Sequence, residues 1–197
     1  LIALVIVLSL FFRYRSADWS WSFPSGRPVR IGSSPAASIP DSDSVPDTVP
    51  SAGPVPAVAW TLDLSEAVIP EHPAAGRIHG RPFRHDQASL QNGVLTLRQG
   101  RQFFADRELM IFLFLKANES VAGNSYLIQP GARLGAPHVW KKWMPPGARI
   151  PDQTNFVNGY AMKLEFGPIN QKQVPGRIYV CLPDAEKTAV AGTFQAQ

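Results

Sequence analysis

The sequence predicts an all-β domain, an antiparallel two-sheet β-sandwich of Greek-key or jelly-roll type, that follows a single transmembrane helix and an extended tether. Three features of the 197 residues lead to this prediction: an uncharged apolar start, a segment rich in proline and serine, and a long remainder in which short apolar stretches alternate with turn signals. We expect residues 1–15 to be the helix, 16–57 an interfacial aromatic segment with the tether, and 58–197 the sandwich.

The first twelve residues, LIALVIVLSLFF, carry no charge and no helix breaker. As a helix they would cover only about 18 Å, whereas a bilayer span needs roughly 20 residues. Because the sequence begins with Leu1 rather than methionine, we expect further residues upstream and interpret the run as the second half of a transmembrane helix. The alternatives are a buried helix or a signal peptide, but Phe-Phe-Arg-Tyr-Arg is a poor cleavage site.

Basic and aromatic residues follow the apolar run directly. Arg13 and Arg15 can extend to lipid headgroups, and Tyr14, Trp19 and Trp21 suit the membrane–water interface. These five residues are the predicted membrane contacts. Two arginines after the span favour a cytoplasmic domain, but a single anchor with a tether and a β domain more often faces outward, so we expect a periplasmic or other extracytoplasmic location.

Residues 24–56 contain eight prolines and seven serines. Such a composition cannot bury enough apolar surface to fold alone, and it favours extended conformations. At about 3.1 Å per residue the segment could reach on the order of 100 Å. It is therefore predicted to be a spacer between the membrane and the β domain.

Hydrophobic periodicity predicts the strands of the domain. Residues 59–64 alternate between apolar and polar, and Asn92-Gly93 is typical of a hairpin turn. Residues 109–115 (LMIFLFL) are continuously apolar, which is typical of a strand buried on both faces. Further strands are expected at 125–129, 138–143, 160–166, 177–182 and 188–194. About eight or nine strands of this kind fit a sandwich.

The closing stretch, residues 175–184 (PGRIYVCLPD) and 190–194 (VAGTF), resembles the final hairpin of bacterial extracytoplasmic β-sandwich domains. The resemblance implies a fold and a bacterial setting outside the cytoplasm. It implies no activity.

Charge and cysteine content exclude several classes of function. Residues 1–57 are balanced, and residues 58–197 hold fifteen basic and eleven acidic side chains, which gives the net charge of +4. The basic residues are scattered apart from Lys141-Lys142, whereas nucleic-acid binding requires a basic stripe or patch. Cys181 is the single cysteine, so neither an intrachain disulfide nor a cysteine zinc site can form, and its apolar neighbours predict a buried thiol.

No motif for catalysis or for a metal or cofactor is present. His79 and His85 are the best-spaced of four histidines, with His72 and His138 further away, but there is no His-x-His or HExxH pattern. We expect His79 and His85 to be solvent-exposed residues in turns. A G-x-S-x-G elbow is also absent. The remaining route to an enzyme is a carboxylate pair that converges only in the fold. The acidic residues are few and mostly lie in predicted turns, so we expect a protein that is not an enzyme and has no cofactor.

The segment from His138 to Met144 is the candidate contact surface. Trp140, Lys141, Lys142 and Trp143 lie within it, and we predict that they contact a partner or a ligand. Exposed aromatic rings on a sandwich can stack on sugars, and lysines can accompany acidic polymers. Since the two tryptophans are three residues apart, a regular strand directs them to opposite faces. One is expected outside and the other in the core.

We therefore expect a non-catalytic, membrane-anchored accessory or scaffolding subunit of a larger membrane complex of respiratory, photosynthetic or secretion type. The helix would pack among the helices of other subunits. The alternative is a membrane-tethered module that binds carbohydrate or another ligand, and this alternative predicts an exposed aromatic strip on one sheet.

Overall fold

The computed structural model describes residues 54–132 and 135–197, and every regular element in these ranges is a β-strand. In this part of the chain no helix is long and apolar enough to cross a membrane. The predicted helix, nearly all of the tether and the five interface residues from Arg13 to Trp21 lie outside the described ranges. They stay predictions.

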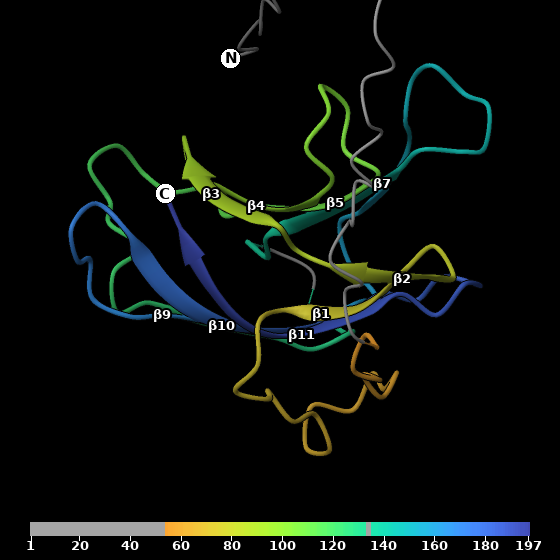
Figure 1. The fold of residues 1–197 in the computed structure, drawn as a ribbon. Helices are drawn as coiled ribbons and strands as arrows, with labels where there is room; N and C mark the ends of the chain where they lie inside the picture. The colour runs from red at the N-terminus through yellow and green to blue at the C-terminus, as the bar shows by residue number, and fades with distance from the viewer. Residues whose placement is uncertain (1–53, 133–134) are drawn as a thin grey trace, which may run out of the picture. The chain divides into compact units, whose positions relative to one another are not determined.

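The strands form two antiparallel sheets that lie as two layers, the arrangement of a β-sandwich (Figure 1). The six-stranded sheet has the order β2-β1-β11-β10-β9-β6, and the five-stranded sheet has the order β3-β4-β5-β7-β8. The all-β prediction is thus confirmed. In chain order, the strands are β1 (Ala75–Ile78), β2 (Arg81–Arg84), β3 (Gln87–Gln91), β4 (Val94–Gln99), β5 (Arg107–Phe112), β6 (Ser125–Ile128), β7 (His138–Trp143), β8 (Asp152–Phe156), β9 (Ala161–Phe166), β10 (Val174–Cys181) and β11 (Ala189–Ala196).

Alternate side chains of both sheets fill one hydrophobic core. Leu97, Leu109 and Ile111 point inward from the five-stranded sheet, and Leu164 and Ile178 are among those that meet them from the six-stranded sheet. All five are fully buried. Because strand side chains alternate, each sheet also has an outer face, and the two outer faces differ sharply in what lies on them.

Three strand predictions have clear outcomes. Asn92 and Gly93 form the β3–β4 turn with φ of 52° and 74°, as a hairpin turn of this sequence requires. Residues 59–64 are not a strand; they belong to an irregular segment. The apolar run at 109–115 is buried on one face only, because β5 alternates between fully buried and half-buried residues and Phe114 beyond it is 59% exposed.

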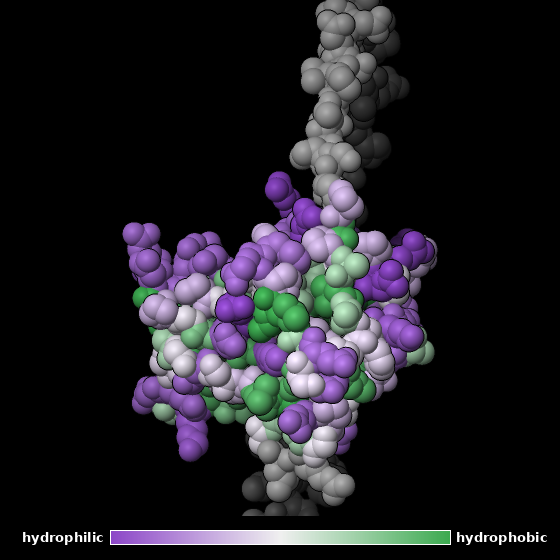
Figure 2. All heavy atoms as spheres, turned by 90° about the horizontal axis from the view of Figure 1, so that it is seen from below, coloured by the Kyte–Doolittle hydropathy of each residue, from purple (hydrophilic) through white to green (hydrophobic). Residues whose placement is uncertain are grey.

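An irregular segment, residues 54–72, covers the outer face of the six-stranded sheet, and we call it the strap (Figure 1). Small side chains on this face, such as Ala161 and Ala191, let Leu64 of the strap become buried against them. The Tyr179 hydroxyl accepts the Thr61 N–H at 3.1 Å and lies 2.8 Å from the Thr61 carbonyl oxygen. Seen from this side, hydrophobic residues gather in the middle of the surface among hydrophilic ones (Figure 2). This outer face is therefore already occupied by the chain itself.

Candidate functional site

The tight turn of the β1–β2 hairpin brings a histidine to one end of the sandwich. His79 and Gly80 are its two central residues, with φ of 50° and 70°, the left-handed pair of a type I′ turn. The His79 N–H donates to the Thr188 hydroxyl at 3.2 Å. The imidazole stacks on the Trp143 ring of the five-stranded sheet, with centroids 4.0 Å apart.

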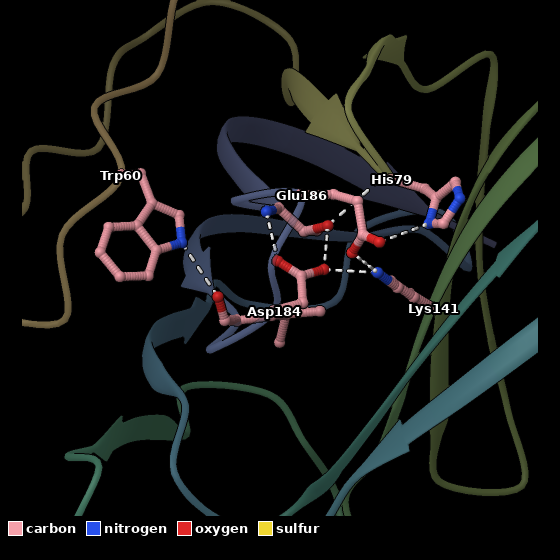
Figure 3. Close-up of polar contacts among 7 residues, drawn as sticks. Trp60, His79, Lys141, Asp184 and Glu186 are labelled. Carbon is pink, nitrogen blue, oxygen red and sulfur yellow. Dashed lines mark hydrogen bonds and ion pairs between the residues drawn. The ribbon is translucent and has the colours of Figure 1, made fainter.

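Beside this pair lies a buried lysine. Lys141 points inward from β7 and is only 2% exposed. Its ammonium group lies 2.5 Å from Asp184 Oδ2 and 3.0 Å from Glu186 Oε2, and both carboxylates come from the β10–β11 connection of the opposite sheet (Figure 3). Thr188 donates its N–H to Asp184 Oδ1 at 2.7 Å. The four residues, Lys141, Asp184, Glu186 and Thr188, form what we call the lysine cluster.

The surroundings of the lysine cluster favour the ionised form of its two carboxylates. Burial acts to raise the pKa of Asp184, but hydrogen bonds from Lys141 and Thr188 outweigh it, so the pKa lies below the ordinary value. The hydrogen bond from Lys141 likewise lowers the pKa of Glu186. Both carboxylates are thus ionised at neutral pH and compensate the buried ammonium. The cluster thus joins the two sheets through a compensated group of charges.

One polar atom next to the lysine cluster lacks a hydrogen-bond partner among the described residues. His79 Nδ1 is buried and has no hydrogen-bond partner among the described residues, because the nearest carboxylate oxygen, Glu186 Oε1, is 3.7 Å away. The Lys141 ammonium also lies 5.2 Å from the centre of the Trp143 ring. The end of the sandwich therefore combines a histidine, a tryptophan and a compensated ion cluster.

The outer face of the five-stranded sheet carries a second group of side chains, which we call the aromatic face: Met110, Phe112, Phe114, His138 and Trp140. The Phe112 and Trp140 rings lie 5.1 Å apart, and the Phe114 and His138 rings lie 4.6 Å apart. Met110 pairs with Trp140, and Phe112 with His138, across β5 and β7. These side chains are half-buried except for Phe114, which is exposed.

The four predicted contact residues do not share one surface. Trp140 lies on the aromatic face, and Lys142 lies on the same outer side, 3.3 Å from Glu108. Lys141 is buried in the lysine cluster, and Trp143 lies on the inner side against His79. The two tryptophans thus point to opposite sides of the sheet.

Sequence reasoning missed the carboxylates of the lysine cluster. Asp184 is 43 residues from Lys141, and nothing in the local sequence links them. One signal was available: a lysine at an inward position of a strand needs a compensating charge.

The histidines do not come together. His79 lies in its turn, His85 Nδ1 is 2.9 Å from the Ala74 carbonyl oxygen, and His72 Nδ1 is 2.9 Å from the Pro73 carbonyl oxygen. His138 contacts Phe114. Among residues 54–132 and 135–197, no three His, Cys, Asp or Glu side chains are grouped so that they could hold a metal ion.

Comparison of the chain with protein-family models, with curated proteins and with solved structures gave no match. Any functional conclusion therefore rests on the geometry of the domain and on the sequence.

Proposed function

We propose that this chain is a non-catalytic, membrane-anchored accessory subunit, and that its β-sandwich binds another protein subunit through the aromatic face. The observation that carries the proposal is the difference between the two outer faces. The strap covers the face of the six-stranded sheet with residues such as Leu64 and Ala67. The aromatic face instead presents Phe114, which is 59% exposed, at the end of a row of aromatic side chains.

The composition of the aromatic face fits a protein interface. Aromatic residues and methionine are enriched in the centres of such interfaces, and charged residues are depleted there. Phe112, Trp140 and Met110 make up the centre, and the ion pair of Glu108 with Lys142 lies in the next row of the sheet. A contiguous apolar patch with a charged border is the usual form of a contact surface. The domain would thus contact its partner while the N-terminal segment holds it at the membrane.

A second candidate function, carbohydrate binding, rests on a depression beside the aromatic face. Its volume is about 240 Å³, and Phe103 and Phe104 line it together with Glu108, Lys142 and Gln153. Phe103 is 89% exposed. Aromatic rings next to polar side chains in a shallow depression can stack on a sugar ring and bond its hydroxyl groups. An exposed aromatic strip on one sheet also fits this second candidate, and in the row of the aromatic face only Phe114 is exposed. We favour a protein partner because Met110, Phe112 and Trp140 at the centre of the row match the composition of protein interface centres.

Extraction of the tagged chain from its native membrane in a mild detergent tests the proposal. We expect the wild-type chain to elute with a larger complex in stoichiometric amount. Phe114→Asn removes the exposed ring and should release the chain from that complex. Leu127→Asn is the matched control, because Leu127 is 64% exposed on the other sheet.

Two outcomes would contradict the proposal. A wild-type chain that elutes alone has no subunit partner, and glycan binding that depends on Phe103 would then favour the second candidate. If Phe114→Asn and Leu127→Asn release the chain equally, the contact does not lie on the aromatic face.

A further inference from the structure

We propose that a pocket at one end of the sandwich binds a small organic anion, one that carries a carboxylate or phosphate group on an apolar body. The pocket has a volume of about 350 Å³ and lies between the β1–β2 hairpin and the ends of β5 and β7. His79, Arg81, Arg107 and Trp143 line it together with residues 144–146, and we call it the arginine pocket. This site is separate from the aromatic face.

The two arginines of the pocket have unused hydrogen-bond donors. Arg81 makes no hydrogen bond or ion pair within residues 54–132 and 135–197. Arg107 donates to Gln99 Oε1 at 3.1 Å, which holds its guanidinium group in place, and its other N–H groups have no hydrogen-bond partner within the described part of the chain. Guanidinium groups match carboxylate and phosphate oxygens in shape and charge, often through two parallel hydrogen bonds.

The two positive charges also lie close enough to affect each other. Burial lowers the pKa of Arg107, the Asp106 carboxylate opposes this effect, and the charge of Arg81 lowers the pKa further. Arginine stays protonated even so, and the two like charges of Arg81 and Arg107 repel each other, an effect that the Asp106 carboxylate offsets at Arg107. An anion between Arg81 and Arg107 would relieve this repulsion, because opposite charges at close range attract strongly at a partly buried site.

One nearby carboxylate, Asp106, acts on Arg107, so two arginines and one carboxylate leave a net positive charge at the pocket. None of the described residues that line the arginine pocket is acidic. Glu186 is the nearest carboxylate to His79, and the Lys141 ammonium compensates it at 3.0 Å. Asp106 forms no ion pair with Arg107 within the described residues.

The walls of the pocket indicate what accompanies the anionic group. The Trp143 ring and the Met144-Pro145-Pro146 segment are apolar, and they stand beside the arginines. The volume exceeds what a bare oxyanion needs and lies within the range of small-molecule sites. We therefore expect an aromatic or short aliphatic anion to bind better than inorganic phosphate.

Calorimetric titration of the purified full-length chain, in a mild detergent and a phosphate-free buffer of low ionic strength, tests the proposal. The probes are phenyl phosphate, benzoate and inorganic phosphate. We expect phenyl phosphate, benzoate or both to bind, with inorganic phosphate weaker than phenyl phosphate. The stronger of the two aromatic probes identifies the anionic group as phosphate or carboxylate.

Charge-removing variants locate the binding. Arg81→Gln and Arg107→Gln should each raise the dissociation constant by about tenfold or more, since each removes charge-assisted hydrogen bonds. Arg177→Gln is the matched control, because Arg177 pairs with Glu71 of the strap on the outer side of the other sheet. Arg81 is exposed, so Arg81→Gln should keep the fold even if Arg107→Gln does not.

Two results would overturn the proposal: no binding of either aromatic probe to the wild-type chain, or equal weakening by Arg177→Gln and Arg81→Gln. The Phe114→Asn variant should bind the probes as the wild type does. Failure of the partner contact and failure of the anion site are thereby distinguished.

Discussion

The Lys141 ammonium group and the Asp184 carboxylate lie 2.5 Å apart in the interior of the domain, although Lys141 lies on β7 of one sheet and Asp184 in the β10–β11 connection of the other. A charge taken out of water is costly unless a partner and hydrogen bonds compensate it. Lys141 has Asp184 and Glu186 as partners, and Asp184 also accepts from Thr188. The sandwich thus has an ionic link between its layers in addition to its hydrophobic core.

The first prediction concerns the stability that depends on this link. Lys141→Met leaves the nearly buried Asp184 carboxylate without its cation, and removal of one member of a buried pair costs about 3–5 kcal/mol. We expect a loss of that size in the free energy of unfolding, measured by urea denaturation. Lys142→Met is the control; its partner Glu108 lies on the outer side, and we expect a loss of about 1 kcal/mol or less. Equal losses in the two variants would contradict a stabilising link between the sheets.

The second prediction concerns the lowered pKa of Asp184. Its ordinary value is 3.8, and the folded value is lower. As the pH falls, the Asp184 carboxylate therefore takes up a proton at a higher pH in the unfolded chain than in the folded chain. The stabilisation that the ionised carboxylate gives above about pH 4 is lost as the pH falls through the folded pKa. The free energy of unfolding of the wild type should fall more steeply between about pH 5 and pH 3 than that of Asp184→Asn. Parallel curves for the two proteins would show that Asp184 does not set this acid sensitivity.

The third prediction links Cys181 to the strap. Cys181 is buried on the sheet face that the strap covers, and burial raises the pKa of its thiol to about 11. At about pH 8 the thiol is protonated and covered, so a disulfide reagent should modify it slowly. Tyr179→Phe removes the hydroxyl that binds Thr61, and we expect modification to become about fivefold faster.

The control for this experiment is Tyr126→Phe, because Tyr126 is half-buried on β6 and makes no hydrogen bond with the strap among the described residues. Its modification rate should equal that of the wild type. Fast modification of the wild-type thiol, at the rate of the unfolded chain, would show that the strap does not protect this face.

The fourth prediction concerns the backbone at Phe114. Its φ is 52°, in the left-handed region that asparagine tolerates far better than phenylalanine, and its side chain is 59% exposed. Phe114→Asn should therefore leave the thermal midpoint unchanged or raise it slightly, as a thermal melt followed by circular dichroism can measure. A lower midpoint would mean that the Phe114 ring stabilises the domain by itself. The presence of this exposed ring would then need no protein partner to explain it.

The sequence predicted the class of fold well because turn residues and alternation mark strands directly. Asn92-Gly93 is an example: its preference for left-handed φ determined the hairpin. The short strands β1 and β2 were missed, since AGRI and RPFR carry little alternation. The alternation of apolar side chains in residues 59–64 predicts a strand, but the segment is irregular and is held by contacts with Tyr179 and by the Trp60 bond to the Leu182 carbonyl oxygen.

The candidate sites were less accessible to sequence reasoning, because they depend on contacts between distant segments. Trp140 and Trp143 could be placed on opposite sides from their spacing alone. The burial of Lys141 could not be predicted in this way, because it depends on Asp184, which lies in the connection between two other strands. The arginine pocket likewise joins Arg81 and Arg107, which are isolated charges in the sequence and neighbours only in the fold.

Site-specific photocrosslinking in the native membrane tests the proposed subunit contact most directly. A photoreactive amino acid at position 114 lies on the aromatic face, and the same group at position 127 lies on the other sheet with similar exposure. We expect a single discrete crosslinked protein partner from position 114 and none from position 127. No product from position 114, or the same products from both positions, would contradict a subunit contact at the aromatic face.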